Sequence, residues 1–266
     1  MMQEKVDRFA QMRVAPQPDS QIRRIVAVMS GKGGVGKSSV TALLASALHA
    51  EGLAVGILDA DITGPSIPHL FGVEGKATIV RDGIMPKLTP GGIKLMSMNC
   101  FLDDETQPAV WRGPMINGML KEFWSKVHWG PLDVLLLDLP PGTGDVPISL
   151  FQMIKVSGLL VLTSPQSLVS MVVEKAVRMG RMMDVPVLGL VENFAWLSCP
   201  HCTEKISLYG PSHSAELAEV EGLPLLASLP LDPALAEKLD AGQAEAITNV
   251  LPSSLLDAVR GKVGGA

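Results

Sequence analysis

A glycine-rich loop with two lysines is the segment of this sequence whose chemistry is clearest. The loop Gly31–Ser38 has the sequence GKGGVGKS and fits the phosphate-binding pattern G-x-x-x-x-G-K-[ST]. It follows an apolar run and precedes an amphipathic segment, as expected for a loop between a strand and a helix. Backbone N–H groups of such a loop converge on phosphates, while Lys37 reaches the β- and γ-phosphates and the Ser38 hydroxyl ligates magnesium. The sequence therefore predicts a site for ATP or ADP with Mg²⁺, against the alternative of a turn that binds nothing.

Three aspartates at the ends of apolar runs are candidates for the magnesium and hydrolysis chemistry. Asp59 and Asp61 follow Val55–Leu58, and Asp138 follows Val134–Leu137. Open α/β sheets bind ligands at the carboxyl ends of their strands, where these carboxylates should gather. Because magnesium uses few carboxylates and keeps several waters, we expect Asp138 to hold it through water and Asp59 to support its coordination shell. Solvated acids in a turn are the alternative for Asp59 and Asp61.

Cys199 and Cys202 form a C-x-x-C pair, a spacing at which two thiolates can bind one metal ion or cluster. Two thiolates are too few for a stable site, which generally has four ligands. A two-fold dimer would bring two copies of the pair together, so that one [4Fe-4S] cluster bridges the subunits. Zinc and a redox-active dithiol remain alternatives. We expect His201 to point away from the ligands and Cys100 to be a buried free cysteine.

The elements that must position these groups alternate along the chain. Apolar runs without polar alternation, typical of strands covered on both faces, are Ile25–Met29, Val55–Leu58, Ile93–Met98, Val134–Leu137, Leu159–Leu162, Val187–Val191 and Leu225–Leu229. Amphipathic periods between them include Ser38–Ala50 and Leu168–Met183. This alternation predicts a doubly wound α/β fold with a mostly parallel sheet.

The domain organisation predicted from the sequence is simple. A single P-loop ATPase domain is expected over residues 23–260, with a flexible leader at 1–22 and a disordered tail at 261–266. A weak helical pattern in the leader (Val6, Phe9, Met12) would let it either dock on the domain or fray.

Composition and charge exclude several classes of protein. The net charge of -5 argues against a large nucleic-acid footprint. The sequence has no long apolar span, and its first residues do not resemble a signal peptide. Its three cysteines do not suggest a disulfide framework. We therefore expect a cytoplasmic protein without a nucleic-acid or membrane partner.

The loop also contains Lys32, five residues before Lys37. It resembles the signature lysine of the deviant Walker A group, the family of MinD, ParA, ArsA and nitrogenase iron protein. The resemblance implies that Lys32 crosses a two-fold interface to the partner's nucleotide, and that Asp61 positions the attacking water. It also implies that Asn193 recognises adenine, with Leu229–Asp232 as a second base-contacting loop. An asparagine amide offers adenine both a donor and an acceptor, although a turn-forming asparagine is the alternative.

Longer motifs are similar to those of a narrower group, the Mrp/ApbC family of iron–sulfur cluster carrier ATPases. These motifs are DADITGPSIPHLFG, WRGPM, WGPLDVLLLDLPPGTGDVPISL, TSPQ, VPVLGLVEN and CPHC, and the similarity runs from about Ile25 to about Asp240. The resemblance implies a homodimer that hydrolyses ATP slowly, binds a cluster at the shared cysteines and hands it to apo iron–sulfur proteins. Two segments depart from the family pattern: residues 203–205 lack the glycine that usually follows the pair, and residues 240–243 differ from D-x-G-x-P.

Two other functions would use the same fold. A positioning switch of the MinD or ParA type would bind membrane or DNA, and would leave the C-x-x-C pair without a purpose. An electron donor resembling nitrogenase iron protein would share the bridging cluster, but its cysteines lie far apart in the sequence.

The site residues assigned by this interpretation fall into four groups. The nucleotide is assigned to Gly31, Gly33, Gly34, Val35, Gly36, Lys37, Ser38, Ser39 and Asn193. Catalysis is assigned to Lys32, Lys37 and Asp61, and magnesium to Ser38, Asp59 and Asp138. The iron–sulfur cluster is assigned to Cys199 and Cys202, while Arg112 of WRGPM receives no role.

Overall fold

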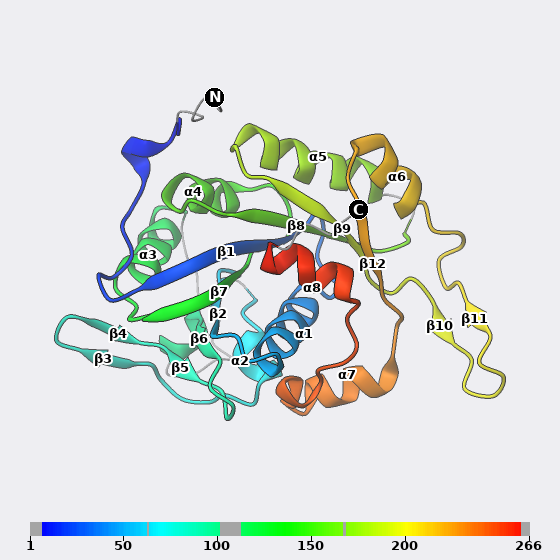
Figure 1. Cartoon of the computed structure of the whole chain (residues 1–266), viewed down its shortest axis with the longest axis horizontal. Helices are drawn as coiled ribbons and strands as arrows, with labels where there is room; N and C mark the ends of the chain where they lie inside the picture. The colour runs from blue at the N-terminus through cyan, green and yellow to red at the C-terminus, as the bar shows by residue number, and fades with distance from the viewer. Residues whose placement is uncertain (1–6, 63, 102–112, 167–168, 262–266) are drawn as a thin grey trace.

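The computed structural model describes residues 7–62, 64–101, 113–166 and 169–261. An eight-stranded sheet forms its centre (Figure 1). In spatial order its strands are β12 (Leu225–Ser228), β9 (Val187–Glu192), β8 (Gly158–Thr163), β1 (Gln21–Ser30), β7 (Pro131–Asp138), β2 (Val55–Asp59), β6 (Lys94–Met96) and β5 (Lys87–Leu88). All neighbouring strands pair in parallel except β5 and β6. The predicted mostly parallel sheet is confirmed.

Helices cover both faces of this sheet. They are α1 (Lys37–Ala50), α2 (Ile67–Leu70), α3 (Gly113–Ser125), α4 (Asp145–Met153), α5 (Val169–Met182), α6 (Ser214–Glu221), α7 (Pro233–Asp240) and α8 (Ser253–Arg260), with short 3₁₀ turns at Ala10–Met12, Met98–Phe101 and Ala244–Ala246. Helices α3 to α6 contribute to one hydrophobic core, and α1, α2, α7 and α8 to the other. The alternation of side chains along β1 separates the two cores, because Ala27 and Met29 face the first and Val26 and Val28 face the second.

All seven predicted apolar runs contribute a strand to the main sheet, and β1 and β7 extend well beyond their runs. The run Ile93–Met98 is instead shortened: only Lys94–Met96 is a strand, and Met98–Phe101 forms a 3₁₀ turn. The reason is the length of the neighbouring strand: β6 pairs with Gly56–Leu58 of β2, and β2 ends at Asp59. After Met96 the backbone no longer pairs with β2 and leaves the sheet.

The leader differs from the predicted flexible segment in its described part, which docks on the domain. Its strand β1 begins at Gln21, inside the predicted leader, where the Gln21 amide donates to the Gly130 carbonyl. The Arg13 guanidinium donates to the carbonyls of Phe151 and Ile154, each at 2.6 Å, and so caps the end of α4. The Trp124 indole also donates to the Val14 carbonyl at 2.6 Å. Residues 7–20 therefore follow the docking alternative, while the tail at 262–266 and Arg112 lie outside the described residues.

Two small hairpins extend from the sheet and were not predicted from the sequence. One pairs β3 (Thr78–Val80) with β4 (Gly83–Met85), and the other pairs β10 (Leu197–Ser198) with β11 (Lys205–Ile206). Figure 1 shows them at opposite ends of the molecule, with the β10–β11 hairpin projecting beyond β12. Among the described residues, no helix has the length and apolar character needed to cross a lipid bilayer.

Candidate functional site

The glycine-rich loop connects the carboxyl end of β1 to the first turn of α1, as predicted. Gly36 precedes α1 with a φ of 76°, a conformation that favours glycine, and a Cβ there would lie 2.4 Å from the Asn193 amide nitrogen. Gly31 has a different constraint, because a Cβ there would overlap the side chain of Val172 on α5. The loop therefore depends on glycine both for its turn and for the close approach of α5.

Asp138 is the polar centre beneath this loop. Its carboxylate is fully buried and accepts hydrogen bonds from Lys37 Nζ at 2.7 Å and Ser38 Oγ at 2.6 Å through the same oxygen. Its second oxygen accepts from Thr41 Oγ1 at 2.8 Å. A serine hydroxyl that donates its proton to a carboxylate keeps its oxygen lone pairs for a cation, so this donor set fits magnesium at Ser38. Thr41 has no assigned role in the sequence motif, although its position one turn after Lys37 points to the same site.

Asp59 organises the loop that follows β2. Its buried carboxylate accepts from the backbone amides of Asp61 at 3.1 Å and Ile67 at 3.3 Å, and from Ser97 Oγ at 3.2 Å. Burial, followed by the nearby charge of Asp138, raises the pKa of Asp59 to about 8. A divalent cation would offset the repulsion between these two carboxylates, so the pair fits the predicted magnesium shell.

Asp61 lies at the surface end of the same loop and is partly exposed. Its amide is held by Asp59 and its carbonyl accepts from the Gly64 amide at 3.3 Å. The two predicted carboxylates of this strand end thus have different environments: Asp59 is fully buried, and Asp61 can meet water.

Lys32 contacts Gln166 within its own chain. Its ammonium group donates to the Gln166 side-chain oxygen, and Gln166 lies shortly after the end of β8 in the TSPQ motif. In the structure, Lys32 thus has a polar partner from its own subunit. Sequence reasoning missed Gln166, because the motif indicated only a family likeness and no contact.

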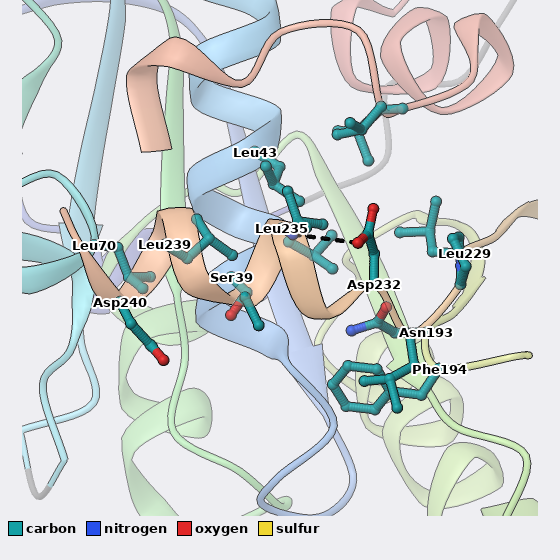
Figure 2. Close-up of a pocket in the computed structure, with 16 residues that line it drawn as sticks. Ser39, Leu43, Leu70, Asn193, Phe194, Leu229, Asp232, Leu235, Leu239 and Asp240 are labelled. Carbon is teal, nitrogen blue, oxygen red and sulfur yellow. Dashed lines mark hydrogen bonds between the residues drawn. The ribbon is translucent and has the colours of Figure 1, made fainter. Parts of the chain in front are cut away.

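A cavity of about 360 Å³ brings together the residues predicted to recognise the base (Figure 2). Ser39 of α1, Asn193 after β9 and residues 229–232 all line it, together with apolar side chains of α1 and α7. The Asn193 side-chain amide donates to the Val35 carbonyl at 3.0 Å, which fixes the amide against the phosphate loop. Asp232 caps α7 by accepting from the backbone amides of Ala234 and Leu235. The predicted base-contacting segments therefore share one pocket.

Cys199 and Cys202 lie in the turn of the β10–β11 hairpin. The Cys199 amide donates to the Glu204 carbonyl and the Thr203 amide donates to the Cys199 carbonyl, both at 2.9 Å. Backbone N–H groups of His201 and then Cys202, together with the Cys202 thiol, lower the pKa of the Cys199 thiol. Cys199 is partly exposed and Cys202 exposed, whereas Cys100 is buried as predicted. The turn thus presents two thiols to an approaching ligand.

Thr203 adopts the conformation that a glycine would normally supply. Its φ is 61°, a left-handed value that is uncommon for a β-branched residue. The departure from the family pattern has therefore left the hairpin turn in place, at the cost of backbone strain on Thr203.

The hairpin is attached on one side to residues that line the predicted base pocket and on the other side to Glu192. On its outgoing side, the Ala195 amide donates to the Leu229 carbonyl at 2.8 Å and the Leu231 amide donates to the Trp196 carbonyl at 2.7 Å. On its returning side, the hydroxyls of Ser212 and Ser214 donate to the buried carboxylate of Glu192, which also accepts from Ser228 at the end of β12. Glu192 directly precedes Asn193, so the cysteine hairpin and the base pocket are built on the same strand end.

The residues predicted to bind the nucleotide thus form one connected region, and the cysteine pair lies on a hairpin that projects from this region. Among the described residues, no group of three or more His, Cys, Asp or Glu side chains is arranged to hold a metal ion. Within the part of the chain described, the cysteine pair supplies two thiol ligands from one subunit.

Comparisons with known proteins cover nearly the whole chain. Residues 21–259 match the family model described as ParA: NUBPL iron-transfer P-loop NTPase. An iron-sulfur cluster carrier protein of Aquifex aeolicus is 46% identical over 230 residues, 86% of this chain and 63% of the relative, so this chain spans less than two thirds of that protein. A solved nucleotide-binding protein from Archaeoglobus fulgidus, in complex with ADP, is 44% identical with a TM-score of 0.76, over 88% of this chain and 91% of the other. The MinC:MinD complex of Aquifex aeolicus, at 18% identity and a TM-score of 0.63 over 91% of this chain and 96% of the other, shares the fold.

Proposed function

The chain belongs to the NUBPL iron-transfer family of ParA-type P-loop NTPases, and on that premise we propose that it is an ATP-hydrolysing carrier of iron–sulfur clusters. Two copies would hold one [4Fe-4S] cluster as cargo and pass it to apo iron–sulfur proteins in the cytosol. The observation that carries the proposal is the cysteine hairpin, which presents Cys199 and Cys202 at the surface. Its outgoing side is bonded to residues that line the pocket, and its returning side is bonded to Glu192, the neighbour of Asn193.

The nucleotide half of the function rests on the region around Asp138. Lys37 and the backbone of Gly31–Gly36 would bind the phosphates, with Ser38 ligating magnesium and Asp138 orienting Ser38. Magnesium bound there would neutralise charge that develops on the phosphates. Asp61, the more exposed of the paired acids, would orient the attacking water. Because this chemistry depends on positioning and not on a strong base, we propose a slow hydrolysis that times a conformational change.

Lys32 would link nucleotide binding to dimer formation. Its contact with Gln166 shows that the side chain can be held in its own subunit. We propose that Lys32 exchanges this neutral partner for the phosphates of the other subunit's nucleotide, since an ammonium–phosphate contact is the stronger of the two. Formation of this Lys32 contact between the two subunits would then depend on the nucleotide.

The cargo half of the function rests on the thiols. The lowered pKa of Cys199 favours the thiolate, which is the form that binds iron. Iron–sulfur clusters of this type use four cysteines, so a second copy would complete the site. Zinc would also accept four thiolates, and it is the competing occupant to be tested.

Anaerobic reconstitution with iron and sulfide tests the proposal. The wild type should bind about four iron and four sulfide per two chains. Cys199→Ala should lose nearly all of this, while Cys100→Ala, which changes the buried cysteine, should load as the wild type does. The loaded protein should convert an apo-ferredoxin to its cluster-bound form. Equal iron in wild type and Cys199→Ala, or a wild type that retains only zinc, would remove the carrier function.

The nucleotide site is tested separately. Lys37→Ala should abolish ATP hydrolysis without preventing iron loading of isolated protein, because the cysteines lie outside the phosphate loop.

A further inference from the structure

The segment that follows the cysteines exposes apolar side chains. Residues 201–213 are all exposed, and among them Ile206, Leu208 and Tyr209 are 42%, 44% and 46% exposed. We call these three side chains the apolar strip. They lie on or just after the hairpin that Figure 1 shows projecting from the body of the molecule. Apolar side chains gathered on a projecting segment indicate a surface that is covered by a partner.

Ile206, the first residue of the apolar strip, is fixed relative to the cysteine pair. Ile206 is the cross-strand partner of Leu197, two residues before Cys199. Ser198 pairs with Lys205, whose ammonium group lies 4.0 Å from the centroid of the Trp196 ring. These contacts stiffen the two-stranded unit, so a protein that covers Ile206 also lies close to Cys199.

The number of thiols on the hairpin indicates that its partner is a second copy of this chain. The pair supplies two thiols, and an identical hairpin related by a two-fold axis would supply the other two. Such an interface is self-complementary, so an apolar strip meets an apolar strip. The hairpin also carries adjacent opposite charges, Glu204 and Lys205, which a two-fold copy can pair in both directions.

Other exposed apolar side chains lack this combination. Ile79, on β3 at the other end of the molecule in Figure 1, is 74% exposed and lies away from the hairpin that holds Cys199 and Cys202. It provides a matched control for the loss of an exposed apolar side chain.

We propose that Ile206, Leu208 and Tyr209 form a two-fold contact between copies of this chain, which holds their cysteine pairs together around the cluster. This inference rests on the proposed function, and it adds the surface that stabilises the loaded dimer. The contact would be separate from the one through which Lys32 reaches the partner's nucleotide, so the cluster-loaded dimer should form without ATP.

The test compares wild type, the triple variant Ile206→Ser/Leu208→Ser/Tyr209→Ser and the control Ile79→Ser. Each is reconstituted anaerobically without nucleotide, and its mass and iron content are measured by light scattering and iron assay. We expect wild type and Ile79→Ser to be loaded dimers. The triple variant should dissociate at protein concentrations at least tenfold higher than wild type and hold half of the iron or less. ADP affinity should be equal in all three, which shows that the variants are folded.

Tyr209 allows a direct second measurement, because it is the only tyrosine in the sequence. Fluorotyrosine incorporated at this position gives one fluorine NMR resonance. Its chemical shift should move on cluster loading of the wild type, and the same loading should leave it unmoved if Tyr209 is outside the contact.

The outcomes separate the two proposals. If wild type takes up no more iron than Cys199→Ala, the carrier function fails and this inference falls with it. If wild type loads and dimerises and the triple variant does so equally, the inference alone is wrong. If the triple variant loads normally but no longer delivers its cluster to apo-ferredoxin, the apolar strip is a recipient surface and the proposed contact is overturned.

Discussion

Asp59 and Asp138 occupy paired positions at the carboxyl ends of the neighbouring strands β2 and β7, and both side chains are fully buried. Lys37 is bonded to Asp138, and its charge also acts on Asp59. Burial of Asp59, followed by the nearby charge of Asp138, raises the pKa of Asp59 to about 8. The strand register itself therefore produces a site that favours an added cation.

The first prediction concerns the pH dependence of stability without nucleotide or metal. The pKa of Asp59 is about 8 in the folded chain, against an ordinary value of 3.8 when the chain is unfolded, so between these values the folded chain holds the extra proton. Stability should therefore fall as pH rises through this window, by up to about 1.4 kcal/mol per pH unit. Asp59→Asn should flatten the fall in melting temperature between pH 5 and 8. Glu237→Gln, a change of an exposed acid on α7, should leave the slope as in wild type.

Gln166 provides a second prediction, because it is bonded to Lys32. Gln166→Ala should release the lysine and increase ATP-dependent dimerisation about three- to tenfold, the worth of one ordinary hydrogen bond. Gln166→Glu should have the opposite effect, since a carboxylate binds the ammonium group more strongly. Analytical ultracentrifugation with ATP measures both. Equal dimerisation of the two variants would show that Gln166 does not restrain Lys32.

Thr203 provides a third prediction. A non-glycine residue in the left-handed region costs about 1–2 kcal/mol, so Thr203→Gly should stabilise the cysteine turn. The expected result is a loaded protein that loses iron to a chelator several-fold more slowly than wild type. Thr203→Ala keeps a Cβ and should give a smaller gain. Faster loss from Thr203→Gly than from wild type would contradict the assignment of strain to this residue.

A fourth prediction concerns Glu192, which holds the returning side of the hairpin. Glu192→Ala leaves the hydroxyls of Ser212, Ser214 and Ser228 without this acceptor, and should lower the free energy of unfolding by about 2–4 kcal/mol. Glu192→Gln retains an acceptor oxygen and should cost less than Glu192→Ala. Chemical denaturation gives the free energies, and hydrogen exchange should show faster exchange at residues 207–214 in both variants. A loss confined to global stability, with unchanged exchange in that segment, would count against the anchoring role.

The sheet and the phosphate loop were predictable because their signals are local. Buried parallel strands appear as continuous apolar runs, and a loop such as Gly31–Ser38 contains its own glycines, lysine and hydroxyl. The end of β6 was not predictable from its own residues, because it is set by where β2 ends. The prediction used apolar content alone, and it therefore placed the end of this strand at Met98, two residues too late.

The contacts that connect separate motifs were also beyond the sequence. Glu192 and Ser212 are twenty residues apart and meet only because the hairpin returns to the strand from which it started. The same holds for Lys32 and Gln166, which lie on loops after different strands. The sequence was sufficient to predict many of the residues that come together at the site. The hydrogen bonds that position these residues could be identified only from the folded structure.

The overlap that a side chain on Gly31 would have with Val172 has a consequence for interpreting inherited or engineered variants. Val172 belongs to no nucleotide motif, yet its methyl groups define the space beside the phosphate loop. A larger residue at 172 would displace the loop and weaken ATP binding while every recognised motif remained intact. Variant classification based on motifs alone would pass over such a change, whereas its biochemical signature would be that of a phosphate-loop defect.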